Sequence, residues 1–178
     1  MIDFTTLCYL ETGNPRQQKA FRVLTDHTIL DCISDFDPLL VGTIPIAIDL
    51  PSSDLDIICC WTDKIGFRNV LIAAFSHHEK FRVTETIIAD IPTILCHFIL
   101  DGFEIEIFGQ PIPTRKQSGY RHMLIEHRLL QENGVGFRQQ VILLKAAGYK
   151  TEPAFSLLLG LTGDPYTALL EYSFPERR

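Results

Sequence analysis

The sequence lacks the features of a membrane protein and those of a secreted, disulfide-stabilised one. No apolar stretch approaches the ~18 residues of a membrane-spanning helix. The first residues, Met1 to Thr6, lack the basic and then apolar order of a signal peptide. The five cysteines are odd in number and form no Cys-x-x-Cys pair, which argues against a disulfide framework and a thiolate zinc site. We therefore expect a cytoplasmic protein with free, mostly buried thiols and no membrane contact.

Positive charge is also scarce. The chain has 16 Lys and Arg against 22 Asp and Glu, a net charge of −6. This balance argues against a long nucleic acid as a partner, because such a partner needs a broad basic surface. A small nucleotide stays compatible, since a metal ion can neutralise its phosphates. The length of 178 residues and a hydrophobic content of 46% indicate a folded chain with one sizeable core.

Residues 1–113 carry alternating helix and strand patterns, and residues 114–178 are helical in pattern. We expect an α+β fold, in which a mixed sheet with flanking helices is packed by a helical C-terminal region in one compact unit. Asn14-Pro15 suits a helix start, and Asp101-Gly102 suits a two-residue hairpin turn. The expected strands are 39–41, 54–61, 82–91, 93–100 and 103–108; the other expected helices are 67–75, 117–132, 135–147 and two short ones beginning at Pro153 and Pro165.

Two aspartates in one apolar strand are the most informative feature. Asp54 and Asp56 point to the same face if the segment is extended, because strand side chains alternate. Two like charges on one face of a buried strand are costly unless a positive group lies between them. A divalent metal ion is the simplest such group.

A later strand supplies further carboxylates. In residues 103–108, Phe103, Ile105 and Ile107 alternate with Glu104 and Glu106. If this strand lies beside the aspartate strand, several carboxylates meet on one sheet face. Such oxygen-rich sites suit Mg²⁺ or Mn²⁺, and two such ions can promote an in-line displacement at phosphorus.

These residues resemble the nucleotidyltransferase superfamily of the polymerase-beta type. The shared pattern is Gly42-Thr43, a spacer of ten residues, Asp54-Leu55-Asp56 in a strand, and an acidic residue on a later strand. The run Ile-Glu-Ile-Phe-Gly and residues 120–128 also resemble an uncharacterised group of small bacterial proteins in that superfamily.

The resemblance implies a mixed sheet with flanking helices and a Mg²⁺-dependent transfer from a nucleoside triphosphate to an acceptor hydroxyl. The acceptor is a small molecule or a protein that no motif identifies. Gly42 and Thr43, with Ser53, would hold the nucleotide. Asp54 and Asp56 would bind metal, and Glu106 would be the third carboxylate, with Glu104 as its competitor. The oligomeric state is left open.

The spacer, residues 44–53, departs from the family pattern because it holds no basic residue. The phosphate charge would then depend on metal, on backbone N–H groups near Gly42, and on cations from elsewhere. Arg121, Arg128 and Lys145 are the candidates. The basic-poor spacer favours an alternative function, a catalytically inactive nucleotide-sensing or protein-binding module. A further alternative is a partner in a toxin–antitoxin-like or resistance system.

Several residues also fit plain structural roles. Ser53 and Asp54 suit a turn before a strand, and Asp49 suits a loop carboxylate. Glu104 and Glu106 taken alone suit the solvated face of an edge hairpin. His122 and His127 are five residues apart and share no helix face, which argues against a zinc site. His122 and Glu126 do share a face, and we expect an ordinary helix-surface pair.

Overall fold

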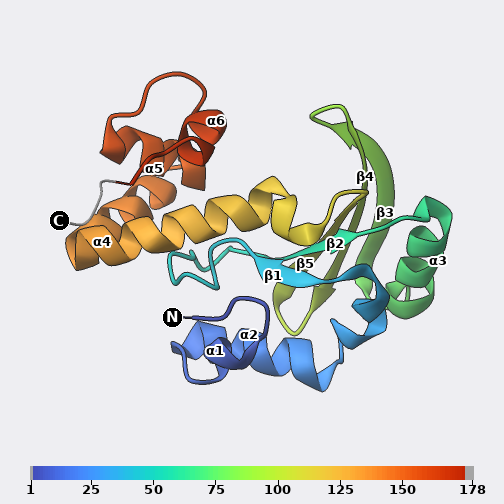
Figure 1. The fold of residues 1–178 in the computed structure, drawn as a ribbon. Helices are drawn as coiled ribbons and strands as arrows, with labels where there is room; N and C mark the ends of the chain where they lie inside the picture. Colours follow the sequence, from blue (N-terminus) through green and yellow to red (C-terminus); the bar gives the residue numbers. More distant parts are fainter. Residues whose placement is uncertain (1, 175–178) are drawn as a thin grey trace.

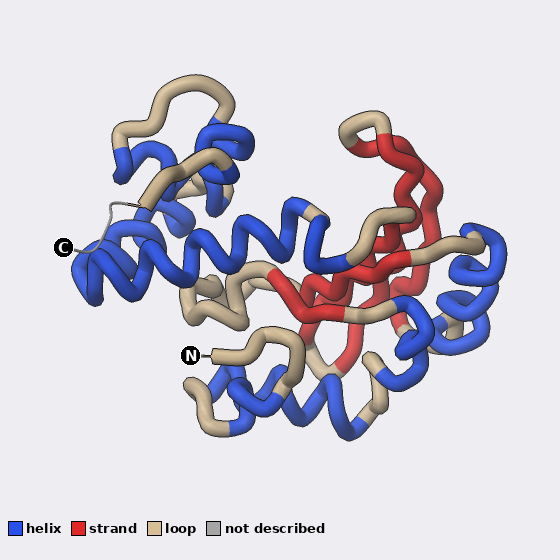
Figure 2. Tube along the Cα trace, viewed as in Figure 1, coloured by secondary structure: helices blue, strands red, loops and turns tan. Residues whose placement is uncertain are grey.

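The computed structural model describes residues 2–174, which form one mixed sheet with helices on both sides (Figure 1). Figure 2 shows the same view by element type, with the strands gathered in one layer. The strands are β1 (Leu39–Val41), β2 (Leu55–Cys60), β3 (Glu79–Ile88), β4 (Ile91–Leu100) and β5 (Phe103–Gln110). The helices are α1 (Cys8–Glu11), α2 (Pro15–Asp26), α3 (Lys64–Phe75), α4 (Ser118–Ala146), α5 (Thr151–Leu159) and α6 (Pro165–Leu170), with 3-10 helices η1 (Asp31–Phe36) and η2 (Thr114–Lys116).

The strand order is β1-β2-β5-β4-β3. The β2–β5 pair is parallel, and the other three pairs are antiparallel. The predicted mixed sheet with flanking helices, and with it the α+β class, is therefore confirmed. The sheet also joins β2 to β5, which are separated in the chain by α3 and the β3–β4 hairpin.

The local signals in the sequence act as expected at two positions. Asn14 caps α2 by accepting from the backbone N–H groups of Arg16 and Gln17, and Pro15 occupies the first turn. Asp101 and Gly102 both have positive φ, 48° and 81°, as a type I′ hairpin turn requires. This turn fixes the register of β4 against β5.

Several predicted boundaries are wrong, among them the starts of β3, at Glu79 and not at residue 82, and of α3, at Lys64 and not at residue 67. The β3–β4 turn lies at Ala89-Asp90, both with positive φ, so Ile91 belongs to the second strand and not to the first. The two helices expected on either side of Glu-Asn-Gly are present; they share the label α4 and meet at a kink at Gly134 (φ 74°, ψ −166°). Helix α5 begins at Thr151, two residues before Pro153; the start of α6 at Pro165 is as predicted.

Each face of the sheet packs against different helices. One face of β2, β4 and β5 forms an apolar core with α2 and α3. A second core joins β1 to α4, α5 and α6 and includes Ile46 and Ile48 of the spacer. Between the second core and the open face of β2 and β5 lies a pocket, described below. The fold thus keeps one face of β2 apolar and leaves the other available for polar side chains.

The structure tests two expectations drawn from composition, the burial of the thiols and the absence of a membrane-spanning helix. The five cysteines are all free, but Cys8 and Cys32 are exposed, and only Cys59 and Cys96 are fully buried. No helix within residues 2–174 combines the length and the apolar character needed to cross a bilayer.

Helix α3 packs so closely on the sheet that β5 needs a glycine there. A Cβ atom at Gly109 would lie 2.1 Å from Cε1 of Phe67, whose ring is fully buried. We expect Gly109→Ala to lower the free energy of unfolding by about 2 kcal/mol, as overpacking does. Gly136→Ala is the control, because a Cβ there meets nothing within 4 Å, and in a helix it should stabilise by up to about 1 kcal/mol. Urea unfolding of both variants is the measurement; equal stability of the two would contradict this account.

Candidate active site

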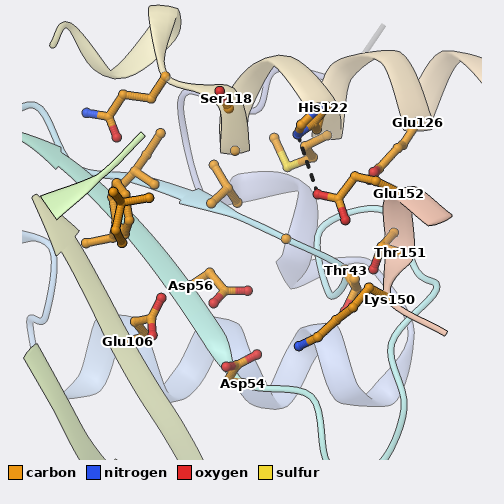
Figure 3. A pocket seen from close by; sticks show the side chains of 18 of the residues that line it. Thr43, Asp54, Asp56, Glu106, Ser118, His122, Glu126, Lys150, Thr151 and Glu152 are labelled. Carbon is orange, nitrogen blue, oxygen red and sulfur yellow. Dashed lines mark ion pairs between the residues drawn. The ribbon is translucent and has the colours of Figure 1, made fainter. Parts of the chain in front are cut away.

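A pocket of about 580 Å³ lies between the open face of β2 and β5 and the helices α4 and α5 (Figure 3). This volume is within the range of small-molecule sites, ~300–1,000 Å³. The polar and charged side chains that line it are Thr43, Asp54, Asp56, Glu106, Gln110, Gln117, Ser118, His122, Glu126, Lys145, Tyr149, Lys150, Thr151 and Glu152.

Asp54, Asp56 and Glu106, here called the carboxylate cluster, lie together on the sheet side of this pocket (Figure 3). Asp56 and Glu106 are register partners in the parallel β2–β5 pair, so their side chains leave the same face from adjacent strands. Asp54 is two residues earlier and shares that face. The structure therefore brings together three of the four predicted metal-binding residues.

Electrostatics at the cluster favour a cation. Burial, together with the charges of Asp54 and Glu106, raises the pKa of Asp56 to about 8. A carboxylate that is desolvated among other carboxylates is stabilised by a positive ion, and all the donors here are oxygens, which Mg²⁺ and Mn²⁺ prefer. Within residues 2–174, no three His, Cys, Asp or Glu side chains are placed so that together they could hold a metal ion. The fit to a divalent ion therefore rests on the oxygen donors and the clustered carboxyl groups, and not on a coordination geometry.

Gly42 makes room for Asp56. A Cβ atom at Gly42 would lie 2.3 Å from Oδ2 of Asp56, and its φ of +83° belongs to the left-handed region that favours glycine. The adjacent Thr43 also lines the pocket. Its hydroxyl donates to Oγ of Ser53 at 3.3 Å, while that Oγ accepts from the backbone N–H of Leu50 at 2.9 Å. Ser53 does not itself line the pocket; it positions Thr43 and closes a turn.

The third carboxylate is Glu106 by position, and Glu104 lies elsewhere. Glu104 is about half exposed, pairs with Arg82 at 3.4 Å, and does not line the pocket. Glu106 is held by His97, whose Nε2 lies 2.6 Å from Oε2 of Glu106. The sequence analysis missed His97, although a signal existed: counting back from the Asp101-Gly102 turn places residue 97 opposite residue 106.

The spacer is apolar because it belongs to the core. Ile44, Ile46 and Ile48 are buried, and side chains from distant helices bind its backbone carbonyls. Gln17 donates to the Ile44 carbonyl, Arg138 to those of Ile46 and Ala47, and Lys145 to that of Ile48. The missing basic residue thus reflects a packed loop that helix α4 anchors.

Arg16 holds the other end of the spacer. Its Nε lies 3.2 Å from Oδ2 of Asp49, and its guanidinium donates to the Ser53 carbonyl at 2.7 Å. Asp49 is therefore a loop carboxylate, as expected.

The predicted phosphate-binding cations divide into two groups. Lys145 lines the pocket but donates to the spacer, and Arg121 and Arg128 do not line the pocket. Arg128 pairs with Glu132 at 2.9 Å. Lys150, which the sequence analysis missed, lines the pocket, and its side chain reaches in on the side of Asp54 (Figure 3).

The helical side of the pocket is polar and buried. The predicted surface pair of His122 and Glu126 is wrong, because both residues are buried, at 5% and 3% exposure, and both line the pocket. His122 instead pairs through Nδ1 with Glu152 at 3.5 Å, and its Nε2 lies 2.9 Å from the Tyr166 carbonyl. His127 packs edge-on against Phe4, outside the pocket lining.

Residues 22–172 match the family described as "Domain of unknown function (DUF4269)". The chain belongs to the DUF4269 family. No curated protein matches the sequence.

Solved structures of similar fold give this DUF4269 chain its architectural class. They include the Cid1 poly(U) polymerase bound to Mg 3′-dATP (TM-score 0.55, 19% identity, 93% of this chain and 52% of that one). The GLD-2/RNP-8 complex is similar too (TM-score 0.54, 16% identity, 86% of this chain and 61% of that one). So is the polymerase core of TRAMP, an RNA surveillance complex (TM-score 0.52, 14% identity, 92% of this chain and 50% of that one). The chain spans between 50% and 61% of the length of these three chains. At these identities the likeness shows the fold alone, which is of the nucleotidyltransferase type.

The buried carboxyl group of Glu126 makes the stability of the folded protein depend on pH. Burial, with Glu152 adding to it, raises the pKa of Glu126 from 4.5 to about 8, and Lys145 opposes the rise. Between these values the folded protein holds a proton that the unfolded chain releases, so this group favours folding fully below pH ~4.5 and loses that effect as pH rises through ~8. Glutamine at this position has no proton to lose, so Glu126→Gln should raise the free energy of unfolding on the order of 1–3 kcal/mol at pH 7.5. At pH 4.5 the same change should have little effect.

Urea unfolding at both pH values is the measurement, with Glu104→Gln, a change at an exposed carboxylate, as the control. A gain of equal size at the two pH values would contradict the assignment.

Proposed function

We propose that this protein is a nucleotidyltransferase that moves a nucleoside monophosphate from a nucleoside triphosphate to an acceptor hydroxyl. One observation carries the proposal: the carboxylate cluster converges from β2 and β5 in a pocket whose edge is formed by Gly42 and Thr43. This arrangement supplies oxygen ligands for a divalent ion beside a backbone turn that can approach phosphates closely. The nucleotidyltransferase-type fold supports the same conclusion.

Each residue of the cluster has a defined task in this proposal. Asp54 and Asp56 would hold the divalent ions, and Glu106 would be the third ligand, kept in orientation by its hydrogen bond to His97. When bound, Mg²⁺ or Mn²⁺ would neutralise phosphate charge and make the acceptor hydroxyl easier to deprotonate. Gly42 matters indirectly, because its missing side chain leaves the Asp56 carboxylate its place.

The reaction is an in-line displacement at the α-phosphorus. The acceptor oxygen forms a bond to this phosphorus while the bond from the phosphorus to the oxygen that bridges to the β-phosphate breaks. Pyrophosphate leaves with the electron pair of that bond, and the hydroxyl proton passes to Glu106. The protein's main contribution is to align the two oxygens and to exclude other geometries.

The phosphates would bind along the edge formed by Thr43 and Lys150. Thr43 offers a hydroxyl, and Lys150 is an exposed cation that reaches into the pocket on the Asp54 side. The structure of Cid1 with Mg 3′-dATP, which has a similar fold, supports a nucleotide at this kind of site. The net charge of −6 favours a small acceptor over an RNA strand here.

A second candidate is a nucleotide-sensing module that keeps the fold and has no turnover. The spacer favours it, because its carbonyls are already bound by Gln17, Arg138 and Lys145 and it offers no cation to a triphosphate. Incubation with labelled ATP and Mg²⁺ distinguishes the two: pyrophosphate release or self-modification supports the enzyme, and binding without either supports the sensor.

The double variant Asp54→Asn, Asp56→Asn tests the proposed function. Calorimetry with ATP and GTP in the presence of Mg²⁺ should show loss of metal-dependent nucleotide binding, and pyrophosphate release should fall at least about 100-fold, since both metal-binding carboxylates are gone. Glu104→Gln is the matched control, because Glu104 lies outside the pocket and pairs with Arg82; it should behave as the unmodified protein does. Unaltered nucleotide binding in the double variant would count decisively against these roles.

A further inference from the structure

Two carboxyl groups on the helical side of the pocket have no task in nucleotidyl transfer. Glu126 of α4 and Glu152 of α5, here called the acidic wall, line the pocket opposite the carboxylate cluster (Figure 3). They come from different helices, so the wall is built by the packing of α5 against α4.

Glu126 is the unusual member of the acidic wall. It is only 3% exposed, it lines the pocket, and its carboxyl group forms no hydrogen bond or ion pair with any residue from 2 to 174. A buried carboxyl group without a partner is costly. Burial, and after it the charge of Glu152, raises the pKa of this carboxyl group, which agrees with its lack of a partner. An unpartnered acidic group that faces a cavity points to a ligand of opposite charge.

The positive groups near Glu126 are already engaged. Lys145 of α4 acts on it through space, but its ammonium group donates to the Ile48 carbonyl at 2.8 Å. His122, one turn before Glu126, faces Glu152 through Nδ1 and the Tyr166 carbonyl through Nε2. Glu152 retains partial exposure, 21% of its side chain, toward the pocket. Among residues 2–174, then, no cation pairs with Glu126, and its carboxyl group stays available to a ligand in the pocket.

The acidic wall does not suit phosphate. A triphosphate placed there would meet two carboxyl groups, whereas the opposite edge offers Thr43 and Lys150. The base and ribose of a nucleotide carry no positive charge at neutral pH, so of the two substrates of a nucleotidyl transfer the acceptor is the one that can bring a cation to the wall. Its matching group is a cation that can donate hydrogen bonds.

We propose that the acidic wall binds a protonated amine of the acceptor, so that the acceptor is an amino alcohol or amino sugar. Its ammonium group lies between Glu126 and Glu152, and its hydroxyl faces the carboxylate cluster. The hydroxyl part rests on the proposed function, and the ammonium part stands on the wall alone. Charge-assisted hydrogen bonds in a desolvated site are strong enough to give this selectivity.

The test compares two probes that differ at one group. Glucamine carries an ammonium group where sorbitol carries a hydroxyl, and NMR titration of the full chain without nucleotide measures the affinity of each. We expect glucamine to bind at least about 10-fold more tightly, and Glu126→Gln and Glu152→Gln each to remove most of this preference. Glu104→Gln, a change at a carboxylate outside the pocket, should keep it. Equal binding of the two probes, no binding of glucamine, or a preference that survives in Glu126→Gln would overturn the proposal.

A second arm separates this inference from the proposed function. The double variant Asp54→Asn, Asp56→Asn should lose Mg²⁺-dependent ATP binding and keep the preference for glucamine, because the acidic wall is intact. A protein that never binds Mg²⁺ and ATP but prefers glucamine would refute the proposed function and leave the amine site standing. A protein that binds Mg²⁺ and ATP but shows no preference would do the reverse. Thermal melting of every variant checks that the fold is retained.

Discussion

The repulsion among Asp54, Asp56 and Glu106 is the constraint on which the rest of this structure depends. Three carboxylates meet on one sheet face because β2 and β5 pair in parallel with residues 56 and 106 in register. Their proximity is unfavourable by itself, so other contacts must fix the strands. The apolar core on the opposite face, formed with α2 and α3, supplies those contacts. Burial of apolar side chains on the opposite face of the sheet therefore offsets the electrostatic repulsion among the carboxylates.

Helix α4 connects the helical side of the pocket with the spacer loop next to Thr43. Its first half contributes His122 and Glu126 to the pocket lining, and its second half contributes Arg138 and Lys145, which bind the carbonyls of the spacer. A loop whose own side chains are largely apolar is thus held in place by residues of other elements. This explains why the spacer can lack cations and still present Thr43 at the pocket edge.

Local patterns predicted the strands and part of the site, and long-range packing decided the remainder. Strand alternation placed Asp54 and Asp56 on one face, and the Asp101-Gly102 turn implied the β4–β5 register. The parallel pairing of β2 with β5 involves residues about fifty apart, and no local signal specifies it. Whether Glu104 or Glu106 reaches the pocket depends on that pairing and on Arg82. Helical periodicity grouped His122 with Glu126, but it does not report which face another helix will cover.

The left-handed backbone at Gly134 acts as an elbow between the two halves of α4. With regular helical torsions throughout, residues 118–146 would form a straight rod, and a rod cannot place both halves where they now lie. His122 and Glu126, which line the pocket, would then be separated from Arg138 and Lys145, which bind the loop that follows Thr43. A single residue without a side chain, remote from the chemistry, therefore sets the relative position of the groups that would hold the two reactants.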